Sequence, residues 1–363
     1  MGFAAIHDQD VALQLLRNTL RTDRIPGAFL FWGPDGVGKH LAAIEMARAV
    51  NCRESVDDAC DTCLSCRKVS SGNHPDLQTV QPASKTRVIK TQIISDVIDL
   101  AMLSPREGRR RVFIILDAER ITPEGQNKFL KTLEEPPGNS LFILVTHQPR
   151  LLLPTIRSRC QVVRFRALRP ETVIQLLQRE RSLPDELTAS VAALAQGQMS
   201  RALDMVDSEK RTLMLSFTQR LADGEDPVLL AEEFVSQLSE QRKQVEADID
   251  SALDAEEKGS LPPEERDRIK EERVAAVAAV LHRELLEYLY LLETWYRDQL
   301  VYSMVPDPSN HVLNLDQLDR LTTETSTDAA AKIAAIERCR RLLDRHISEE
   351  RVFRDMFLAL AAP

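Results

Sequence analysis

The chain carries the octapeptide Gly33-Pro34-Asp35-Gly36-Val37-Gly38-Lys39-His40, and this stretch decides the fold of its N-terminal part. An apolar run at residues 28–32 precedes it and an apolar-periodic segment at residues 41–50 follows it, which gives the order strand, glycine-rich loop, helix. The glycines let the backbone turn tightly, so that its N–H groups and the positive end of the helix face one anion. The pattern predicts a phosphate-binding loop of the type G-x-x-x-x-G-K-[ST], in which Lys39 adds a charge for the outer phosphates.

The loop departs from that pattern at its last position, where His40 replaces a residue with a hydroxyl group. The hydroxyl normally ligates Mg²⁺. We therefore expect the loop to be able to hold a nucleotide while its Mg²⁺ chemistry is compromised. The predicted nucleotide contacts within the loop are Gly33, Gly36, Gly38, Lys39 and His40.

A second departure follows the apolar run at residues 111–116, which ends in Asp117. In phosphate-loop proteins an acid at this position helps to hold Mg²⁺. Hydrolytic relatives follow it directly with a glutamate that polarises the attacking water, whereas here Ala118 takes that place. Glu119 comes one residue later and is expected to point elsewhere on the turn, so phosphoryl transfer should be slow even where nucleotide binding survives.

Composition is that of an ordinary globular chain of 363 residues with 43% hydrophobic and 28% charged residues, for which we expect two or three domains. A net charge of −9 argues against a stand-alone nucleic-acid-binding protein. Because no apolar run approaches about 18 residues and the first residues lack a signal-peptide pattern, we expect a cytoplasmic protein without a membrane partner.

Predicted strands alternate with predicted helices up to about residue 166, which favours a parallel α/β sheet with right-handed crossovers. The strands are expected at residues 28–32, 111–117, 141–145 and 161–165, and residues 74–80 are expected to form a turn that leads into a short strand. From residue 169 the strands vanish; short helices come first, followed by longer ones such as 227–238 and 274–297. We expect an α/β domain at residues 1–167, a small helical domain at 168–207 and an all-α domain at 208–363, with the charge-dense stretch 239–273 as a solvated helical excursion broken at Gly259 and Pro262-Pro263.

Four of the six cysteines, Cys52, Cys60, Cys63 and Cys66, lie within one short segment. Clustered thiols in a cytosolic chain indicate a metal site rather than disulfides. Four thiolates satisfy tetrahedral Zn²⁺ without an open position, so we favour a structural zinc insertion at residues 52–66. The C-x-x-C-x-x-C core would also suit an iron–sulfur cluster, and chance clustering of reduced thiols is the third interpretation.

Arg159 lies in the tripeptide Ser158-Arg159-Cys160, which closes a short predicted helix beyond the sheet. Taken alone, an arginine at such a place is more often an ordinary surface residue. Its functional interpretation is an arginine finger that reaches the γ-phosphate on a neighbouring subunit, because the planar guanidinium is always charged and binds in a bidentate way.

Four segments in the same order resemble the AAA+ clamp-loader family of bacterial DNA polymerase III, and its delta-prime type in particular. They are residues 29–39, the four cysteines, Leu130-Lys131-Thr132-Leu133-Glu134-Glu135-Pro136-Pro137 and Ile156-Arg157-Ser158-Arg159-Cys160. The resemblance is rich in motifs over residues 1–205 and only architectural afterwards. It implies an AAA+ domain, a lid domain and a collar domain in a hetero-pentamer with gamma/tau and delta subunits, which opens a sliding clamp and places it on primed DNA.

The resemblance also implies roles for single residues. Lys39 and the loop glycines would contact phosphates, the four cysteines would bind zinc, and Arg159 would be the finger that acts in trans. The segment 197–203 looks like the sensor-2 segment of the family, with Arg201 as its arginine, and Thr146 looks like the sensor-1 position.

The two departures at positions 40 and 118 bear on which subunit type is expected. A gamma-type ATPase should carry a hydroxyl residue and a glutamate there, whereas this chain has His40 and Ala118 and lacks a long tau-like tail. We therefore expect a stator of the DNA-directed DNA polymerase holoenzyme that serves its neighbour but hydrolyses little or no ATP; whether it binds ATP stays open. An active gamma/tau-like motor is the alternative, and an unrelated phosphate-loop enzyme such as a small-molecule kinase would leave the helical C-terminal third unexplained.

Overall fold

The structure is a computed structural model that describes residues 2–82, 88–254, 263–323, 328–343, 345 and 347–362. The chain divides into two compact units. The first comprises Met1–Val173 and Gln196–Arg201, and the second comprises Ile174–Ala195 and Ala202–Pro363. The predicted small helical domain at residues 168–207 thus contributes residues to both units, and its separate status stays a prediction.

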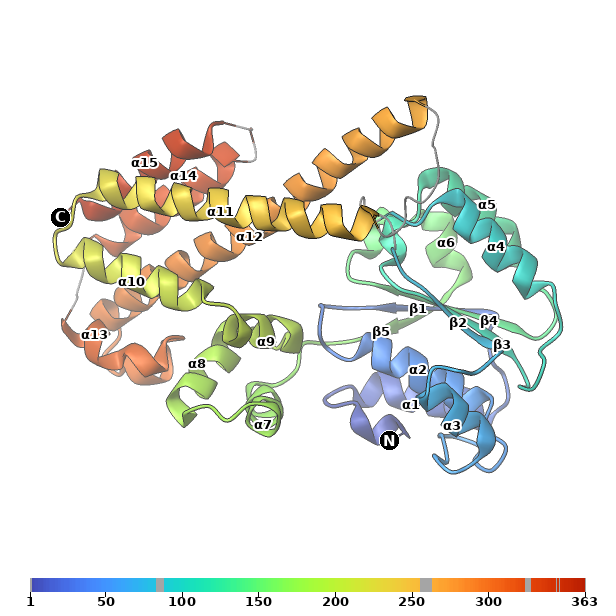
Figure 1. Cartoon of the computed structure of the whole chain (residues 1–363). Helices are drawn as coiled ribbons and strands as arrows, with labels where there is room; N and C mark the ends of the chain where they lie inside the picture. Colours follow the sequence, from blue (N-terminus) through green and yellow to red (C-terminus); the bar gives the residue numbers. More distant parts are fainter. Residues whose placement is uncertain are drawn as a thin grey trace. The chain divides into compact units, whose positions relative to one another are not determined.

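A parallel five-stranded sheet forms the centre of the first unit, as predicted, with the strand order β2-β3-β4-β1-β5 (Figure 1). The strands are β1 (Ala28–Trp32), β2 (Leu77–Val80), β3 (Arg111–Ile115), β4 (Ser140–Thr146) and β5 (Gln161–Arg164). Every residue of β3 and β4 is buried, because helices cover both faces of a parallel sheet. Since β1 pairs with both β4 and β5, the carboxyl ends of these three strands meet at one edge of the sheet.

Helices cover the two faces of this sheet, with α1, α2 and α3 on one side and α4, α5 and α6 on the other (Figure 1). Their bounds are α1 (Asp10–Arg21), α2 (Lys39–Val50), α3 (Leu64–Ser70), α4 (Thr91–Ala101), α5 (Pro123–Glu134) and α6 (Pro154–Arg159), with the 3₁₀ turns η1 (Gly2–Ala5), η2 (Ala118–Arg120) and η3 (Pro149–Leu151). Helix α5 begins after Thr122, because the Thr122 side chain accepts the N–H of Gly125 and Pro123 occupies the first turn. The ring of Phe142 packs 5.4 Å from that of Phe113 and 5.1 Å from that of Phe129, which ties β3, β4 and α5 into one core.

The described part of the second unit is helical. Helix α7 (Pro170–Glu180) begins in the first unit and continues in the second, and the segment that α9 occupies also belongs to both. The other elements are α8 (Asp185–Leu194), α9 (Met199–Asp207), α10 (Lys210–Ala222), α11 (Pro227–Asp254), α12 (Pro263–Met304), η4 (Pro308–Asn310), η5 (Leu315–Gln317), α13 (Leu318–Thr323), α14 (Ala329–Leu343) and α15 (Glu349–Ala361). The ring of Phe234 on α11 lies 5.0 Å from Phe353 and 5.7 Å from Phe217, so an aromatic cluster joins α10, α11 and α15.

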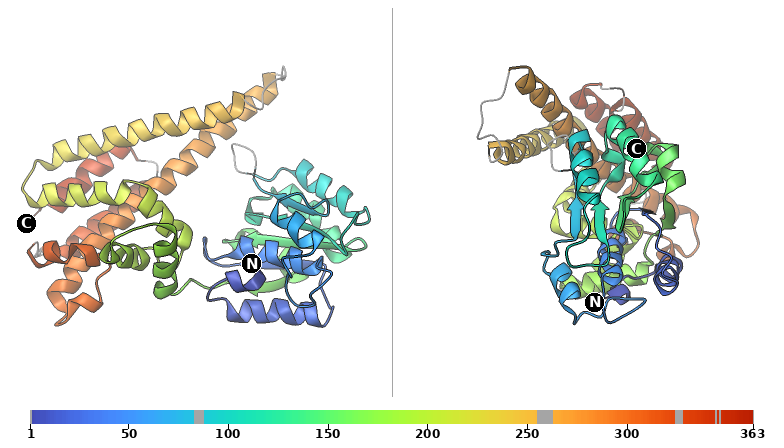
Figure 2. Two further views of the ribbon diagram at one scale, coloured as in Figure 1. Left: turned by 60° about the horizontal axis from the view of Figure 1, so that its bottom comes forward. Right: turned by 90° about the vertical axis from the view of Figure 1, so that its right-hand side faces the viewer.

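The two longest helices run further than predicted, with 28 residues in α11 and 42 residues in α12. Most of the charge-dense stretch 239–273 is therefore helical, since Glu, Gln, Lys, Arg and Ala favour a helix even without an apolar stripe. The predicted break at Gly259 and Pro262 lies outside the described residues, whereas Pro263 begins α12. Figure 2 shows the converging ends of α11 and α12 extending beyond the other helices of the unit.

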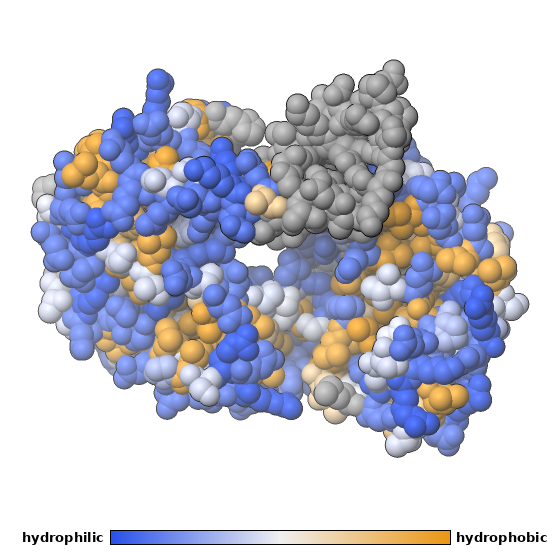
Figure 3. Space-filling view, viewed as in Figure 1, coloured by the Kyte–Doolittle hydropathy of each residue, from blue (hydrophilic) through white to orange (hydrophobic). Residues whose placement is uncertain are grey.

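Among the described residues, no helix is both long and apolar enough to cross a bilayer. On the face drawn in Figure 3, hydrophilic residues predominate and apolar residues gather in small patches.

Candidate nucleotide pocket and cysteine cluster

The phosphate loop connects the end of β1 to the start of α2 and depends on its glycines. Gly36 and Gly38 have φ angles of +69° and +93°, in the left-handed region that favours glycine. A Cβ atom at Gly36 would lie 2.3 Å from the backbone nitrogen of Ser200, and one at Gly33 would lie 2.4 Å from the carbonyl oxygen of Phe165. The loop therefore has the local conformation that the sequence predicted, and it packs closely against the segment Gln196–Arg201.

Lys39 is buried at the first position of α2. Its Nζ donates to the carbonyl oxygens of Gly33 and Pro34, at 2.8 and 2.5 Å, and lies 3.4 Å from Oδ1 of Asp35. Burial lowers the pKa of Lys39, while Asp35 acts in the opposite direction. The ammonium group is thus held by acceptors of its own loop, and phosphate oxygens would compete with those acceptors for its three donors.

A cavity of about 550 Å³ lies beside the loop, within the size range of small-ligand sites. It brings together six of the predicted nucleotide residues, namely Gly36, Gly38, Lys39, His40, Asp117 and Thr146. Its other lining residues are Asp35, Gln81, Pro82, Leu116, Val145 and His147. Gly33 lines a neighbouring pocket instead. Partial burial lowers the pKa of His40, which favours its neutral imidazole.

The residue that sequence reasoning missed is His147, which follows β4 directly and lines the cavity. Its Nδ1 lies 2.6 Å from Oε1 of Glu119 and 3.7 Å from Oδ1 of Asp35. The interaction with Glu119 raises the pKa of His147, against the effect of burial. Burial alone would raise the pKa of Glu119, but the neighbouring His147 and Thr146 side chains lower it below its usual value.

Glu119 does not line the cavity, so its carboxylate is not placed like that of a water-activating glutamate. The Glu119 carboxylate is nevertheless close to the cavity, because it is buried against Thr146 and His147, and both of these residues line the cavity. Asp117 adopts a left-handed backbone conformation with φ 47°, and its side chain is half exposed. The only sequence signal for His147 was its place directly after a buried strand and after Thr146.

The sensor-2 candidate Arg201 lies in the segment Gln196–Arg201, which packs with the first unit. The N–H of Leu168 donates to the carbonyl oxygen of Gly197 at 2.9 Å, and Gly197 has a φ angle of +75°. The segment is therefore anchored after β5 while Ser200 touches the phosphate loop at Gly36. Thr146 is buried, and its Oγ1 accepts the N–H of Gln148 at 3.0 Å.

Arg159 lies outside the cavity, at the last position of α6. Its Nη1 donates to the carbonyl oxygen of Thr155 at 3.0 Å, and its Nη2 forms an ion pair with Glu134 of α5. The side chain is 30% exposed. The guanidinium is thus held at the surface of the first unit rather than in the pocket of its own chain.

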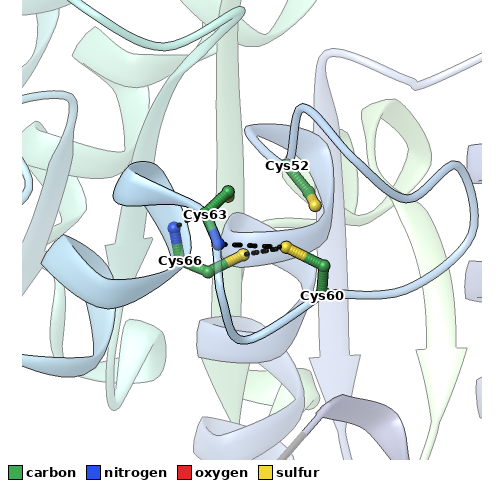
Figure 4. Close-up of side chains that lie close together, drawn as sticks. All are labelled: Cys52, Cys60, Cys63 and Cys66. Atoms are coloured by element: carbon green, nitrogen blue, oxygen red, sulfur yellow. Dashed lines mark hydrogen bonds between the residues drawn. The ribbon is translucent and has the colours of Figure 1, made fainter.

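The four clustered cysteines converge on one point between α2 and α3 (Figure 4). Their sulfur atoms all lie within 4.8 Å of one another, and Sγ of Cys60 is 3.9 Å from Sγ of Cys66. Sulfurs bound at about 2.3 Å to a tetrahedral zinc ion lie about 3.8 Å apart, so the donor set fits Zn²⁺. Backbone N–H groups of Ser55, Cys63 and Cys66 point at the sulfurs of Cys52, Cys60 and Cys63, at 3.3, 3.3 and 3.4 Å, and would stabilise thiolate charge.

The thiols differ in their surroundings. The Thr62 hydroxyl and the Cys63 N–H lower the pKa of Cys60 to about 6. Burial raises the pKa of Cys66 to about 12, and it does the same for the isolated Cys160 and Cys339. A zinc ion would have to displace the Cys66 proton, whereas the two isolated cysteines have no thiol partner nearby and are expected to be inert.

Ser65 and His74 form a hydrogen bond of 3.1 Å beside the cysteine cluster. The pair cannot act as nucleophile and base, because Nδ1 of His74 accepts the N–H of Asp76 and the proton therefore sits on Nε2, facing Ser65. Asp76 is buried and accepts the backbone N–H groups of Arg106, Glu107 and Gly108 at 2.7 to 2.8 Å. These contacts fasten α3 and the start of β2 to the loop before β3.

The N-terminal part of the chain is similar to subunits of DNA polymerase III. Residues 8–169 match the family model described as "DNA polymerase III, delta subunit". The chain is 37% identical to DNA polymerase III subunit delta' of Bacillus subtilis (strain 168) over 165 residues, which are 46% of this chain and 50% of that relative. It is 34% identical to the delta' subunit of Pseudomonas aeruginosa over 160 residues, which are 44% of this chain and 48% of that relative.

Tau subunits match as well. The tau subunit of Bacillus subtilis is 31% identical over 234 residues, which are 63% of this chain and 40% of that relative. Among solved structures, a DNA polymerase III gamma subunit-related protein of Thermotoga maritima aligns with 98% of this chain and 99% of that chain, at 17% identity and a TM-score of 0.43. Because this TM-score and identity are low, the resemblance to DNA polymerase III subunits rests on the sequence matches alone.

The chain spans about half the length, or less, of these curated relatives. Within that span, the predicted resemblance to the clamp-loader subunits of DNA polymerase III is confirmed, and it is delta-prime-like.

Proposed function

We propose that this chain, a delta-prime-like relative of the clamp-loader subunits of DNA polymerase III, is a stator of such a complex. In this role it binds other loader subunits of the gamma/tau and delta types and helps to place a sliding clamp on primed DNA. It hydrolyses little or no ATP itself and supplies Arg159 to the ATP site of a neighbouring subunit.

The observation that carries the proposal is a phosphate pocket that keeps its cradle and lacks two catalytic groups. The cradle consists of the glycine loop and Lys39, which line the cavity. One missing group is a hydroxyl at position 40, and the other is a carboxylate at position 118, where a buried alanine stands. Each group of this kind is typically worth a factor of about 10² or more in rate, because phosphoryl transfer depends on positioning and charge stabilisation.

Glu119 is a poor substitute for the missing carboxylate. Its side chain is 3% exposed and engaged with His147, and it does not line the cavity. A water molecule in line with a bound γ-phosphate would therefore lack a base on this turn. This supports a subunit whose nucleotide pocket is kept for binding or for structure rather than for turnover.

Arg159 is available to a neighbour because it lies at the surface, outside the pocket of its own chain. Its two anchors, the carbonyl of Thr155 and the carboxylate of Glu134, restrict the side chain to one region. A restricted guanidinium loses less entropy when it binds a phosphate in trans, which suits a finger.

The remaining parts are assigned by the same proposal. The insertion 52–66 binds a structural zinc ion, residues 168–207 form a small helical lid domain, and residues 208–363 form the collar through which subunits assemble. A helical second unit with an aromatic core gives the collar a rigid body of its own.

The test combines assembly and hydrolysis. The chain is mixed with gamma/tau and delta subunits, and the mass of the native complex and its DNA-stimulated ATPase are measured with wild-type chain and with Arg159→Ala. We expect a multimeric complex in both cases and at least about a tenfold lower ATPase with the variant. A chain that never joins a complex, or an unchanged ATPase in a complex that contains the variant, would contradict the proposal.

An ATP-hydrolysing motor of the gamma/tau type is the second candidate. It is favoured by the glycine loop with Lys39 and by Asp117 at the cavity, and by the matches to tau subunits. Steady-state hydrolysis by the isolated chain separates the two: brisk turnover that is lost in Lys39→Ala would support the motor, and turnover near background in both proteins would support the stator.

A further inference from the structure

Three side chains beside the phosphate cavity form a second group of potential metal ligands. Asp117, Glu119 and His147 each offer one ligand atom, and these atoms lie within 4.8 Å of one another. The two acids follow β3, and the histidine follows β4. Because β3 and β4 are paired in parallel, their carboxyl ends lie side by side and bring the three residues together.

The spacing suits a single ion. Ligand atoms bound at about 2.1 Å to one ion lie about 3.0 to 4.2 Å apart, depending on geometry. The 2.6 Å between Nδ1 of His147 and Oε1 of Glu119 is slightly shorter, so a small rotation of either side chain would admit an ion. His147 and Asp117 line the cavity, which leaves room for water or phosphate oxygens to complete the coordination.

The chemistry of the donor set disagrees with Mg²⁺. Mg²⁺ demands oxygen ligands in near-octahedral geometry, whereas imidazole suits first-row transition metals such as Co²⁺, Ni²⁺ and Zn²⁺. The end of the phosphate loop also disfavours Mg²⁺, because His40 offers an imidazole where Mg²⁺ needs a hydroxyl. His40 lines the same cavity. With histidines at positions 40 and 147 in its lining, the cavity is a poor magnesium site.

Burial supplies the reason for a cation at this place. The Glu119 side chain is 3% exposed, and a buried carboxylate is costly unless a positive charge compensates it. The imidazole of His147 lies beside this carboxylate, and Asp35 lies 3.7 Å from the same ring nitrogen. Lys39 lies near enough to interact with both acids and opposes a second cation, but its ammonium is engaged by the carbonyls of its own loop.

We propose that Asp117, Glu119 and His147 bind one divalent transition-metal ion, with Co²⁺ or Zn²⁺ as representatives, in preference to Mg²⁺. On binding, the ion coordinates Nδ1 of His147 and any proton on that nitrogen passes to solvent. The site needs neither a nucleotide nor another subunit, so it stands or falls independently of the proposed stator role.

The test uses the full chain with its cysteine cluster loaded with zinc. Co²⁺ is titrated into this protein without nucleotide, and binding is followed by calorimetry and by visible absorption. Zinc is retained by the thiolates because Zn²⁺ outranks Co²⁺ at such sites, and cobalt–thiolate absorption would reveal any exchange. We expect about one further equivalent of Co²⁺ without thiolate absorption, and a tenfold excess of Mg²⁺ should not displace it.

Variants locate the ion. His147→Ala, Glu119→Gln and Asp117→Asn should each weaken Co²⁺ binding by about tenfold or more, while His7→Ala, at an exposed histidine of the same unit that does not line the cavity, should not. His147→Asn is the second variant should His147→Ala fail to fold, as judged by circular dichroism. The inference is overturned if no further equivalent binds, if a tenfold excess of Mg²⁺ displaces the Co²⁺, or if the three variants bind like the wild type. ATPase and assembly assays on the same proteins report on the stator role separately.

Discussion

The first unit holds two groups of metal-binding side chains that differ in openness. The cysteine cluster is closed: four sulfurs face one another, and backbone N–H groups of the same segment point at them. The group of Asp117, Glu119 and His147 is open: two of its members line a cavity of about 550 Å³. A closed set of four thiolates leaves no coordination position for a substrate, whereas an open set does.

The difference teaches where each group should act. An ion held by the cysteines can only join α2 to α3 and so contributes to folding. An ion or a phosphate in the open group remains exchangeable, so changes there should alter binding and leave the fold intact. Variants of the two groups should therefore separate stability from affinity.

Removal of the cysteine cluster should give the largest effect. We expect about one zinc ion per chain by elemental analysis, and for Cys60→Ser a loss of zinc together with about 3 to 5 kcal/mol of unfolding free energy. The reason is that the segment 52–66 has few other side chains to bury. Thermal unfolding of the wild type with and without a strong chelator provides the measurement. His7→Ala, at an exposed histidine of the same unit, is the matched control and should melt like the wild type. Equal melting of Cys60→Ser and the wild type would contradict the structural role of the cluster.

The carboxylate of Asp76 should give the next largest effect, because it fastens the segment after the cysteine cluster to the sheet. Burial acts to raise the pKa of Asp76, but three backbone N–H donors and Arg111 outweigh it and lower the pKa. Asp76→Asn should cost about 3 kcal/mol, since the amide cannot accept all these bonds. Denaturant unfolding of this variant is compared with Asp99→Asn, an exposed acid of α4.

The sign of the pH dependence follows from the same shift. A lowered pKa in the folded state means that Asp76 contributes its full stability above the unfolded value of about 3.9 and loses it as the pH falls below that value. The difference in stability between the wild type and Asp76→Asn should therefore be constant near neutral pH and shrink below about pH 4. A difference that grew on acidification would contradict the assigned hydrogen bonds.

Gly36→Ala tests the open cavity, because Gly36 is one of the residues that line it. Alanine at φ +69° is strained, and its Cβ would lie 2.3 Å from the nitrogen of Ser200. We expect a loss of about 2 kcal/mol and weaker ATP binding. Gly72→Ala is the control, because Gly72 has φ +75° and no atom within 4 Å of the added Cβ, so it measures the conformational cost alone. Equal losses of unfolding free energy in both variants would mean that the segment 196–201 moves away from the added methyl group at little cost.

The parallel sheet and the cysteine cluster could be predicted because their signals are local. The strands β3 and β4 lie in continuous apolar runs that end in a polar residue, as at 111–117, and such runs predict burial on both faces. The four thiols lie in one short segment, so their spacing alone suggested that they meet. The structure brings them within 4.8 Å of one another.

The partnership of Glu119 and His147 could not be predicted, because it depends on β3 and β4 being neighbours in the sheet. Strand order is a long-range property that no spacing in the sequence reveals. The extent of α11 was missed for a different reason: beyond residue 238 the helix has few apolar residues to mark its period, and propensity alone continues it.

His40→Thr should give the smallest effect and sharpens the comparison most directly, since it changes only which metal the open pocket accepts. Threonine restores the hydroxyl that ligates Mg²⁺ beside a nucleotide. We expect the affinity for ATP in the presence of Mg²⁺ to rise about tenfold, or about 1.4 kcal/mol, with little change in the presence of EDTA. Equilibrium titration with a fluorescent ATP analogue measures both. His40→Ala removes the imidazole without adding a hydroxyl and should show no such gain; if it gains equally, the imidazole acts by steric exclusion, and the open group does not select its metal through position 40.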